Sequence, residues 1–385
     1  MDEWEKVKVG DIGKVITGKT PKTYNSEYYG GNIPFLTPSD DMSVKYVRRT
    51  NKYITELGRL SVKNATLPAN AICVSCIGSD LGKVVITTQE TVTNQQINSI
   101  VVDTDKFDID FVYYSMLELG KVLNFHSKTS TAVPIVNKSS FSQYEIDCPK
   151  LNTQKRIGAI LSSIDKKIEE NNQINNNLEQ QAQAIYQQMF IDNPTPDWIE
   201  GSLSDIANIT MGQSPSGSSY NEDRIGAIFF QGRAEFGFRF PTIRLYTTEP
   251  KRMAYANDIL MSVRAPVGDL NVAHNDCCIG RGLAAIHSKT NHQSFVLYTM
   301  FSLKKQLNVF NGEGTVFGSI NRNSLNDMPI LIPADEQIEK FELIVAPMDA
   351  AIRNNYDEIC CLQAVRDSLL PRLMSGELDV SNIDI

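Results

Sequence analysis

A whole-domain internal repeat limits the possible folds of this chain more than any other feature. The pattern W-x6-D-I-x5-G-x2-P occurs from Trp4 to Pro21 and again from Trp198 to Pro215, displaced by 194 residues. Further pairs follow in the same order, at displacements that fall to 187, 186 and 184: NAICVS with NDILMS, NQQINSI with GRGLAAI, and FVYY with FVLY. Small loop deletions in a duplicated unit leave such a drift. Because the period is far too long for a solenoid, it indicates two copies of a whole domain.

Each copy has the pattern of an α+β domain. In the first copy NAICVSCIG, KVVITT and INSIVV are typical of strands, and Gly, Pro, Asn and Ser separate such runs. The segment IDFVYYSMLELGKVLNF has helical spacing with one internal glycine. We therefore predict two similar α/β domains with long loops, in residues 1–150 and 193–333.

A different pattern follows each copy, in residues 151–192 and 334–385. Apolar residues alternate at spacings of four and three from Ile157 to Met189, and again from Phe341 to Leu373 after adding 184. Such a seam predicts two long helices that pack on each other as an antiparallel coiled coil. The alternative is that each helix packs only on its own domain. The seam positions expected at the spacer and partner interface are Ile164, Ile168, Asn171, Asn175, Leu178, Ile352, Asn355, Ile359 and Leu362.

The order domain, helix, domain, helix makes the second helix return antiparallel to the first and relates the copies by a pseudo-two-fold axis. With the centres of the seams in register, Asn175 lies opposite Asn355 and Asn171 opposite Ile359. A polar layer of this kind fixes register at some cost in stability. Pro347 interrupts the second seam, and we expect the second helix to restart there with proline in its first turn.

The net charge of −8 is unevenly distributed. Residues 1–150 contain 17 basic and 17 acidic groups, residues 193–333 contain 12 of each, and residues 334–385 contain 4 and 11. Seven of the eight excess negative charges therefore lie in the last segment. Each neutral domain could present a basic face, so the charge does not exclude nucleic acid as a partner.

The sequence shows no catalytic or metal-binding constellation. Its four histidines lack metal-site spacing, no G-x-S-x-G occurs, and neither does the Asn/Asp-Pro-Pro-aromatic tetrapeptide of amino-methyltransferases. Cys73 and Cys76 form a lone C-x2-C that we interpret as buried strand cysteines. We therefore expect a binding protein rather than an enzyme, with no metal site.

Seven cysteines without framework spacing, no apolar run of membrane-spanning length and no secretory signal predict a reduced, cytoplasmic protein without a membrane partner. The adjacent pairs Cys277–Cys278 and Cys360–Cys361 are expected to be small buried residues.

Polar, aromatic and basic loops at matching places in the two copies are the candidate binding sites. Such side chains suit phosphate contacts and base-edge hydrogen bonds, since Gln can pair with adenine and Arg with guanine. The alternative is an ordinary polar surface loop. The candidates are Lys19, Thr20, Lys22, Tyr24, Tyr28, Thr37 and Gln95 in the first copy, and Gln213, Ser214, Ser216, Tyr220, Arg233, Arg264 and Arg281 in the second.

Arg239 follows Arg233 in the same segment and is a further candidate. The positions of Arg264 and Arg281 are occupied in the first copy by Ile77 and Gln95, respectively. This difference is expected if the two domains read different bases. Neutral sequence divergence after duplication explains it equally well.

The chain resembles the DNA-specificity subunit of type I restriction–modification enzymes. The resemblance rests on the two W-x6-D-I-x5-G-x2-P starts, on NQQINSI and GRGLAAI, on the proline segments that end both domains, and on LLPRLMSGEL near the C-terminus. It implies two target recognition domains, each reading one half of a bipartite site in double-stranded DNA, and helices that set the gap. It also implies two methyltransferase subunits and restriction subunits as partners. S-adenosylmethionine, ATP and Mg would then belong to those partners, and this chain would hold no cofactor.

Two other functions fit parts of the sequence. The chain could be the target-recognition part of a fused or stand-alone methyltransferase or nuclease system. It could also be a scaffold that joins two proteins without reading DNA.

Overall fold

The structure is a computed structural model that describes residues 4–78, 81–129, 135–312, 318–381 and 383. It divides into two compact units. Unit 1 comprises Met1–Asn171 with Asp357–Ile385, and unit 2 comprises Asn172–Tyr356. Within the described ranges, no helix has the length and apolar character that a membrane span requires.

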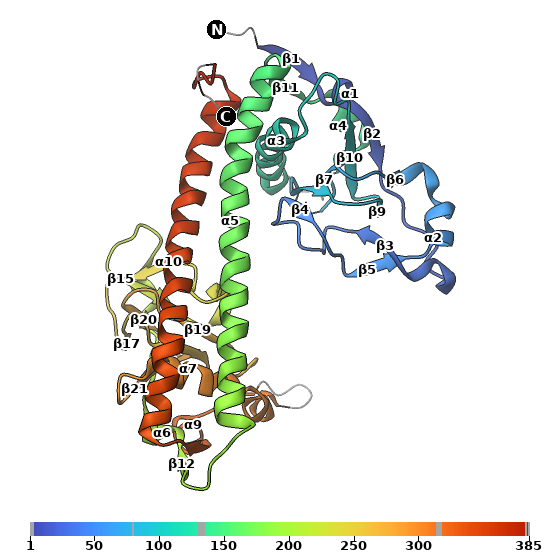
Figure 1. The fold of residues 1–385 in the computed structure, drawn as a ribbon. Coiled ribbons are helices and arrows are strands. Elements are labelled where there is room, and N and C mark those ends of the chain that lie inside the picture. Colours follow the sequence, from blue (N-terminus) through green and yellow to red (C-terminus); the bar gives the residue numbers. More distant parts are fainter. Residues whose placement is uncertain (1–3, 79–80, 130–134, 313–317, 382, 384–385) are drawn as a thin grey trace. The chain divides into compact units, whose positions relative to one another are not determined.

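Unit 1 is a mixed α+β body with three sheets (Figure 1). Their strand orders are β2-β10-β7-β8-β4, β5-β3-β9-β6 and β1-β11. The strands are β1 Glu5–Lys8, β2 Gly13–Thr17, β3 Tyr29–Leu36, β4 Tyr46–Val47, β5 Lys52–Ile54, β6 Thr66–Leu67, β7 Ile72–Ser75, β8 Val84–Thr87, β9 Thr91–Thr93, β10 Ile97–Val102 and β11 Glu145–Cys148. The helices are α1 Val9–Ile12, α2 Glu56–Ser61, α3 Ile109–Thr129 and α4 Lys138–Gln143, with 3-10 turns at Ser26–Tyr28 and Lys63–Ala65.

The predicted strands and helix of the first copy are confirmed as β7, β8, β10 and α3. Helix α3 packs on β7 and β8, and its buried Phe111 and Tyr114 lie in the same apolar core as Ile72 of β7. The internal glycine of α3 has a packing reason. A Cβ on Gly120 would lie 2.1 Å from the carbonyl oxygen of Gly82, so only glycine permits this approach.

Unit 2 also has three sheets, ordered β13-β21-β18-β19, β14-β16-β15-β20-β17 and β12-β22. Its strands are β12 Ile199–Ser202, β13 Ala207–Met211, β14 Tyr220–Asn221, β15 Ala227–Phe230, β16 Leu245–Thr247, β17 Met253–Ala254, β18 Ile259–Ser262, β19 Leu270–Val272, β20 Cys277–Ile279, β21 Leu283–Ser288 and β22 Pro329–Ile332. Its short helices are α6 Leu203–Ile206, α7 Gln293–Ser302, α8 Lys304–Leu307 and α9 Arg322–Asn326, with 3-10 turns at Gly217–Ser219, Arg233–Glu235 and Asn308–Asn311.

The two units share one topology. The order β2-β10-β7-β8 recurs as β13-β21-β18-β19, and β5-β3-β9-β6 recurs as β16-β15-β20-β17. Strands β3 and β9 are parallel, and so are their counterparts β15 and β20. Isolated bridges also match, since Ile77 pairs with Ile135 and Arg264 with Ser319. The duplication predicted from the sequence is therefore confirmed in strand order and direction.

Two long helices carry the predicted seams: α5, Leu151–Tyr186, and α10, Asp335–Met374. In unit 1, Ile157 and Leu161 of α5 share a core with Leu370 and Leu373 of α10. Further along, Asp165 pairs with Arg366 at 3.0 Å, and the Asn171 amide donates to Glu358 Oε2 at 2.8 Å. Because the α10 number falls as the α5 number rises, the two segments are antiparallel within this unit.

The unit 2 segments of these helices are also antiparallel. The Asn355 amide donates to Asn175 Oδ1 at 2.8 Å, and Asn175 is 3% exposed. This hydrogen bond confirms the register predicted for these two residues. Ala182 of α5 and Phe341 of α10 lie in a core with residues of α7, so the helices pack on their own domain as well as on each other. After Tyr186 the chain continues as a π-helical turn, Gln187–Ile191.

The seam positions predicted at the interface point inward to different extents. Asn171 donates to Glu358, the residue before its predicted partner Ile359. The buried positions are Ile168, Asn171, Asn175, Ile352 and Ile359, and the half-buried ones are Ile164, Leu178, Asn355 and Leu362.

Replacing Asn355 with alanine should destabilise unit 2 by about 1–3 kcal/mol, because it leaves the buried Asn175 carbonyl oxygen without this donor. Urea unfolding would measure the loss. Asn354, the exposed neighbour, provides the matched alanine control, which should change stability by less than about 0.5 kcal/mol. Equal effects of the two substitutions would contradict a structural role for the asparagine pair.

The predicted restart of the second helix at Pro347 is wrong, because α10 is continuous from Asp335 to Met374. Pro347 is exposed, and so is Leu343, whose carbonyl loses its helical donor. Water can reach that carbonyl. Burial of Val345 and Ile352 on the opposite face offsets the cost of an internal proline, about 3 kcal/mol.

The prediction that Cys360 and Cys361 are buried is also wrong, since both are exposed. They follow the buried seam residue Ile359 and point away from the seam. Cys277 and Cys278 are buried as predicted, and so are Cys73, Cys76 and Cys148. Burial raises the pKa of Cys73 to about 12 and that of Cys76 to about 11.

Iodoacetamide should therefore modify two cysteines of the native protein, Cys360 and Cys361, and all seven after unfolding. A buried thiol with a raised pKa forms little thiolate, which is the species that reacts. Mass spectrometry of the alkylated peptides would count the labels. Rapid native labelling of Cys73 would contradict the packing of β7.

Candidate nucleic-acid interface

The first candidate loop of unit 1 begins where β2 ends. Lys19 is exposed, and its backbone N–H donates to the Thr93 carbonyl at 2.8 Å. The Thr20 hydroxyl donates to Gln95 Oε1 at 2.6 Å. The structure therefore brings Lys19, Thr20 and Gln95 together beside the end of β9, and the hydroxyl orients the Gln95 amide.

Lys22 and Tyr24 lie further along this loop. Tyr24 is 81% exposed, and the Lys22 ammonium lies 5.7 Å from its ring centroid. This pair presents a cation and an aromatic face to solvent, a combination suited to a base or a phosphate. Thr20 also lines a pocket of about 600 Å³ with Tyr29 and Lys52.

Tyr28 and Thr37 are tied to their own loops. Tyr28 is half-buried, and its carbonyl accepts the Thr55 N–H at 3.0 Å. Thr37 donates to Asp40 Oδ2 from its hydroxyl at 2.9 Å and from its N–H at 2.7 Å. Among the described residues, neither is hydrogen-bonded to the Thr20–Gln95 pair.

Unit 2 repeats the arrangement of the first loop. The Gln213 N–H donates to the Ile279 carbonyl at 3.0 Å, as that of Lys19 does to Thr93. Ser214 Oγ accepts the backbone N–H of Arg281 at 3.2 Å, at the place where the Thr20 hydroxyl bonds the Gln95 side chain in unit 1. The same loop contacts the same turn in both copies, so Gln213, Ser214 and Arg281 lie together.

Arg264 and Arg281 line one pocket of about 330 Å³ in unit 2. Met211, Val263 and Ile320 supply apolar parts of its wall. Both arginines are exposed, and neither forms an ion pair with any residue that the structure describes. The structure thus joins two candidates that lie 17 residues apart in the sequence.

The remaining candidates of unit 2 have partners within the protein. Ser216 Oγ lies 2.8 Å from Ser218 Oγ, and the Tyr220 hydroxyl donates to the Pro215 carbonyl at 3.1 Å. Arg233 forms an ion pair with Asp269. These contacts hold the loop in place and reduce the charge that Arg233 offers to a ligand.

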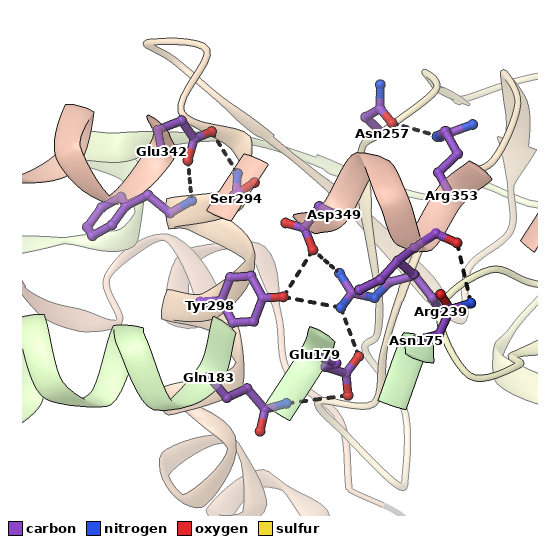
Figure 2. A network of polar contacts seen from close by, with 12 residues as sticks. Asn175, Glu179, Gln183, Arg239, Asn257, Ser294, Tyr298, Glu342, Asp349 and Arg353 are labelled. Atoms are coloured by element: carbon purple, nitrogen blue, oxygen red, sulfur yellow. Dashed lines mark hydrogen bonds and ion pairs between the residues drawn. The ribbon is translucent and has the colours of Figure 1, made fainter. Parts of the chain in front are cut away.

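Arg239 cannot contact DNA in this structure, so the prediction that it is a contact residue is wrong. It is 4% exposed and lies between two carboxylates, at 2.9 Å from Glu179 of α5 and 2.9 Å from Asp349 of α10. Figure 2 shows this network, in which the Tyr298 hydroxyl of α7 donates to Asp349 at 3.0 Å. A buried arginine here joins the loop, α7 and both long helices.

Unit 1 has a corresponding cluster that sequence analysis missed. Lys45 bonds the Tyr114 hydroxyl at 3.3 Å, and that hydroxyl contacts Asp165 at 2.5 Å. Lys45 also pairs with Asp110 at 2.8 Å. Lys45 and Arg239 differ by 194 positions, and Tyr114 and Tyr298 by 184, as do Asp165 and Asp349. Alignment of the two copies was therefore a signal that could have revealed these residues.

Burial is the largest single cause of the pKa shifts at Glu179, Tyr114, Tyr298 and Arg239. It raises the pKa of the Glu179 carboxyl, and the charge of Arg239 opposes this shift. Burial also raises the pKa of Tyr114 and Tyr298, which keeps both phenols protonated. For Arg239 burial acts to lower the pKa, but Tyr298, Asp349 and Glu179 outweigh it, so its pKa is raised and the guanidinium stays charged. In the part of the chain that the structure describes, no three His, Cys, Asp or Glu side chains form a metal site.

The model of the type I restriction modification DNA specificity domain matches this chain twice, at residues 1–180 and 196–355. The chain belongs to this family. The chain is 27% identical to a putative type I restriction enzyme MjaX specificity subunit of Methanocaldococcus jannaschii, over 98% of this chain and 94% of that one. It is 25% identical to the MjaIX specificity subunit of the same organism, over 99% and 95% of the two chains.

Its fold is similar to that of a type I restriction–modification system S subunit from M. genitalium. The TM-score is 0.60 at 16% identity, and the match covers 97% of this specificity chain and 96% of that one. The similarity supports the duplicated architecture of the family.

Proposed function

We propose that this chain is the non-catalytic DNA-recognition subunit of a type I restriction–modification complex, acting on DNA in the cytoplasm. Each unit would read one half of a bipartite site in double-stranded DNA. The observation that carries this proposal is the duplicated loop geometry, in which the Thr20 hydroxyl bonds the Gln95 side chain and the Ser214 hydroxyl bonds the Arg281 backbone N–H at the same place. Hydroxyl, amide and guanidinium groups are the side chains that read base edges and phosphates.

Helices α5 and α10 would form an antiparallel coiled coil that sets the unread gap and docks two methyltransferase subunits. Their antiparallel pairing within each unit supports this role. Restriction subunits would join through the same complex. Residues 334–385, with 4 basic and 11 acidic groups, suit a surface that faces protein rather than phosphate.

S-adenosylmethionine, ATP and Mg would act on the partner subunits. The net charge of −8 is consistent with partner chains that supply many of the phosphate contacts. We therefore expect weak DNA binding by this chain alone and tight binding by the assembled complex.

Coexpression with the partner methyltransferase, followed by genome-wide mapping of modified adenines, tests the proposal. A bipartite motif with a fixed unread gap is the expected result. A purified complex that neither modifies adenines nor shifts duplex DNA in a salt-sensitive manner would instead indicate a scaffold. Modification by this chain without a partner would indicate a fused enzyme.

The gap should lengthen when a heptad is added to both helices. Seven residues inserted after Asn172 in α5 and seven after Tyr356 in α10 add about 10 Å at 1.5 Å per residue. At 3.4 Å per base pair this corresponds to roughly three base pairs. Mapped motifs should keep both halves and gain that spacing. The same insertion in the exposed turn at Glu222–Asp223 is the control, and an unchanged gap in the helix variant would contradict the spacer role.

A further inference from the structure

The pocket that Arg264 and Arg281 share has a donor-rich, cationic lining. Two guanidinium groups supply planar forks of N–H donors and no acceptors. Three other arginines of unit 2 pair with carboxylates of the protein: Arg233 with Asp269, Arg239 with Glu179 and Asp349, and Arg244 with Glu235. Arg264 and Arg281 form no ion pair with a described residue, so a ligand for this pocket must present acceptors.

The backbone that carries Arg281 is held on both sides. The Gly280 N–H donates to Phe230 O at 2.8 Å, and the Gly282 N–H donates to Gln231 O at 3.2 Å. A Cβ at Gly280 would lie 2.8 Å from Gln231 Cα, so the turn packs too closely for a side chain there. Together with the bond from its own N–H to Ser214, this packing fixes the point from which the Arg281 side chain extends.

The backbone beside Arg264 is held as well. The Ala265 N–H donates to Gly318 O at 3.0 Å, and the Ile320 N–H donates to Val263 O at 3.0 Å. The Ser262 hydroxyl donates to the Arg264 carbonyl at 2.8 Å. Both arginines therefore leave anchored strands or turns, so ligand binding need not order the backbone as well as the side chains.

We propose that this pocket reads a guanine in the half-site that unit 2 contacts, an inference that rests on the proposed function. Guanine presents two acceptors, N7 and O6, at its major-groove edge, and one arginine fork can bind both. The second guanidinium binds the same edge or the neighbouring base pair. Met211, Val263 and Ile320 also line the pocket, so part of its wall is apolar.

The matched positions of unit 1 have different chemistry. Ile77 stands where unit 2 has Arg264, and Gln95 stands where it has Arg281. The Thr20 hydroxyl binds Gln95 Oε1 and leaves the amide N–H groups for a ligand. Unit 1 therefore has no guanidinium at these two positions, and the guanine requirement belongs to unit 2.

The test uses the complex of this chain with its methyltransferase. Arg264→Ile and Arg281→Gln place the unit 1 residues in unit 2, and Arg281→Lys keeps the charge but removes the fork. Arg252→Gln, at another exposed arginine of the same unit, is the charge-matched control. Binding is measured on the mapped duplex and on one with 7-deazaguanine in the second half-site, over a series of salt concentrations.

We expect each pocket variant to weaken binding about 5- to 150-fold on the natural duplex, and the variants of the arginine that binds guanine N7 to lose the sensitivity to 7-deazaguanine. Modification maps should relax at that base in the second half-site and stay unchanged in the first. Native-like unfolding midpoints would show that the variants fold.

Three results would overturn the inference. One is a second half-site without guanine. Another is a uniform loss on all sequences with a shallower salt dependence, which indicates a phosphate contact. The third is binding by the Arg281→Gln variant equal to that of Arg252→Gln. Each of these results is compatible with the proposed function. The proposed function itself would fail if the complex with the unaltered chain modified no bipartite motif.

Discussion

Replacing Arg239 with methionine should destabilise unit 2 by about 3–5 kcal/mol. The guanidinium lies 2.9 Å from each of two carboxylates, Glu179 and Asp349. Its removal leaves two half-buried negative charges close together, and the buried Asp349 Oδ2 already lacks a hydrogen-bond partner among the described residues. Methionine keeps much of the side-chain volume, so the loss of charge rather than a cavity accounts for the effect.

The readout can be confined to one unit, because the chain has two tryptophans, Trp4 and Trp198, one in each unit. Fluorescence of Trp198 in a Trp4→Phe background reports urea unfolding of unit 2. This separation matters because a chain with two units need not unfold in one step. Arg252→Met, at an exposed arginine of the same unit, should change the free energy of unfolding by less than about 0.5 kcal/mol. Equal changes in the free energy of unfolding for the two variants would contradict a structural role for the ion pairs of Arg239 with Glu179 and Asp349.

The loss of unfolding free energy caused by Arg239→Met should become smaller as the pH is lowered. Burial raises the pKa of folded Glu179 above its ordinary value of 4.5, and loss of the arginine removes the charge that opposes this shift. At a pH between the pKa of Glu179 in the unfolded chain and its higher pKa in the folded variant, the folded state binds more protons than the unfolded state. The stability of the variant therefore rises as the pH falls through this window. A deficit that grows on acidification would rule out this assignment.

Replacing Phe341 with alanine should cost about 3–5 kcal/mol in unit 2. The ring is fully buried, and ring centroids of Phe190, Tyr186 and Tyr298 lie 5.4, 5.7 and 5.9 Å away. These aromatic groups come from α5, the turn after it and α7, so the cavity would open where α10 meets both the other long helix and the domain. Trp198 fluorescence again measures the change.

Two comparisons sharpen this prediction. Leu343→Ala removes an apolar side chain that is 77% exposed on the same helix, and should cost less than about 0.5 kcal/mol. Ile157 occupies the matched seam position of unit 1 and is 1% exposed, so Ile157→Ala should cost about 2–5 kcal/mol, reported by Trp4. A large effect of Leu343→Ala with a small effect of Phe341→Ala would show that the seam is assigned to the wrong face of α10.

Much of the fold was predictable because its signals are periodic. The 194-to-184 displacement predicted two domains of one topology, and the strand orders agree. The alternation of four and three predicted the buried faces of α5 and α10, and it placed Asn175 against Asn355. Burial of apolar side chains acts along the whole seam, so an interruption such as Pro347 did not break the helix.

The candidate site was less predictable, because composition does not reveal which polar groups meet. Arg239 and Arg264 are both arginines in loop segments of unit 2, yet one is buried between carboxylates and the other lines an open pocket. Thr37 has the residue type of a contact residue, but its hydroxyl bonds Asp40.

The sequence by itself determined the duplication, the α+β character and the helical seams, since each depends on apolar periodicity within one segment of chain. Only the tertiary structure decided which polar side chains are buried, paired or free to bind. Arg264 and Arg281 share a pocket because β18 and β21 are neighbours in one sheet, and Arg239 is buried because Glu179 and Asp349 converge on it from two helices. Partners of a charged group are chosen by folding across large sequence separations, and local pattern carries no record of that choice.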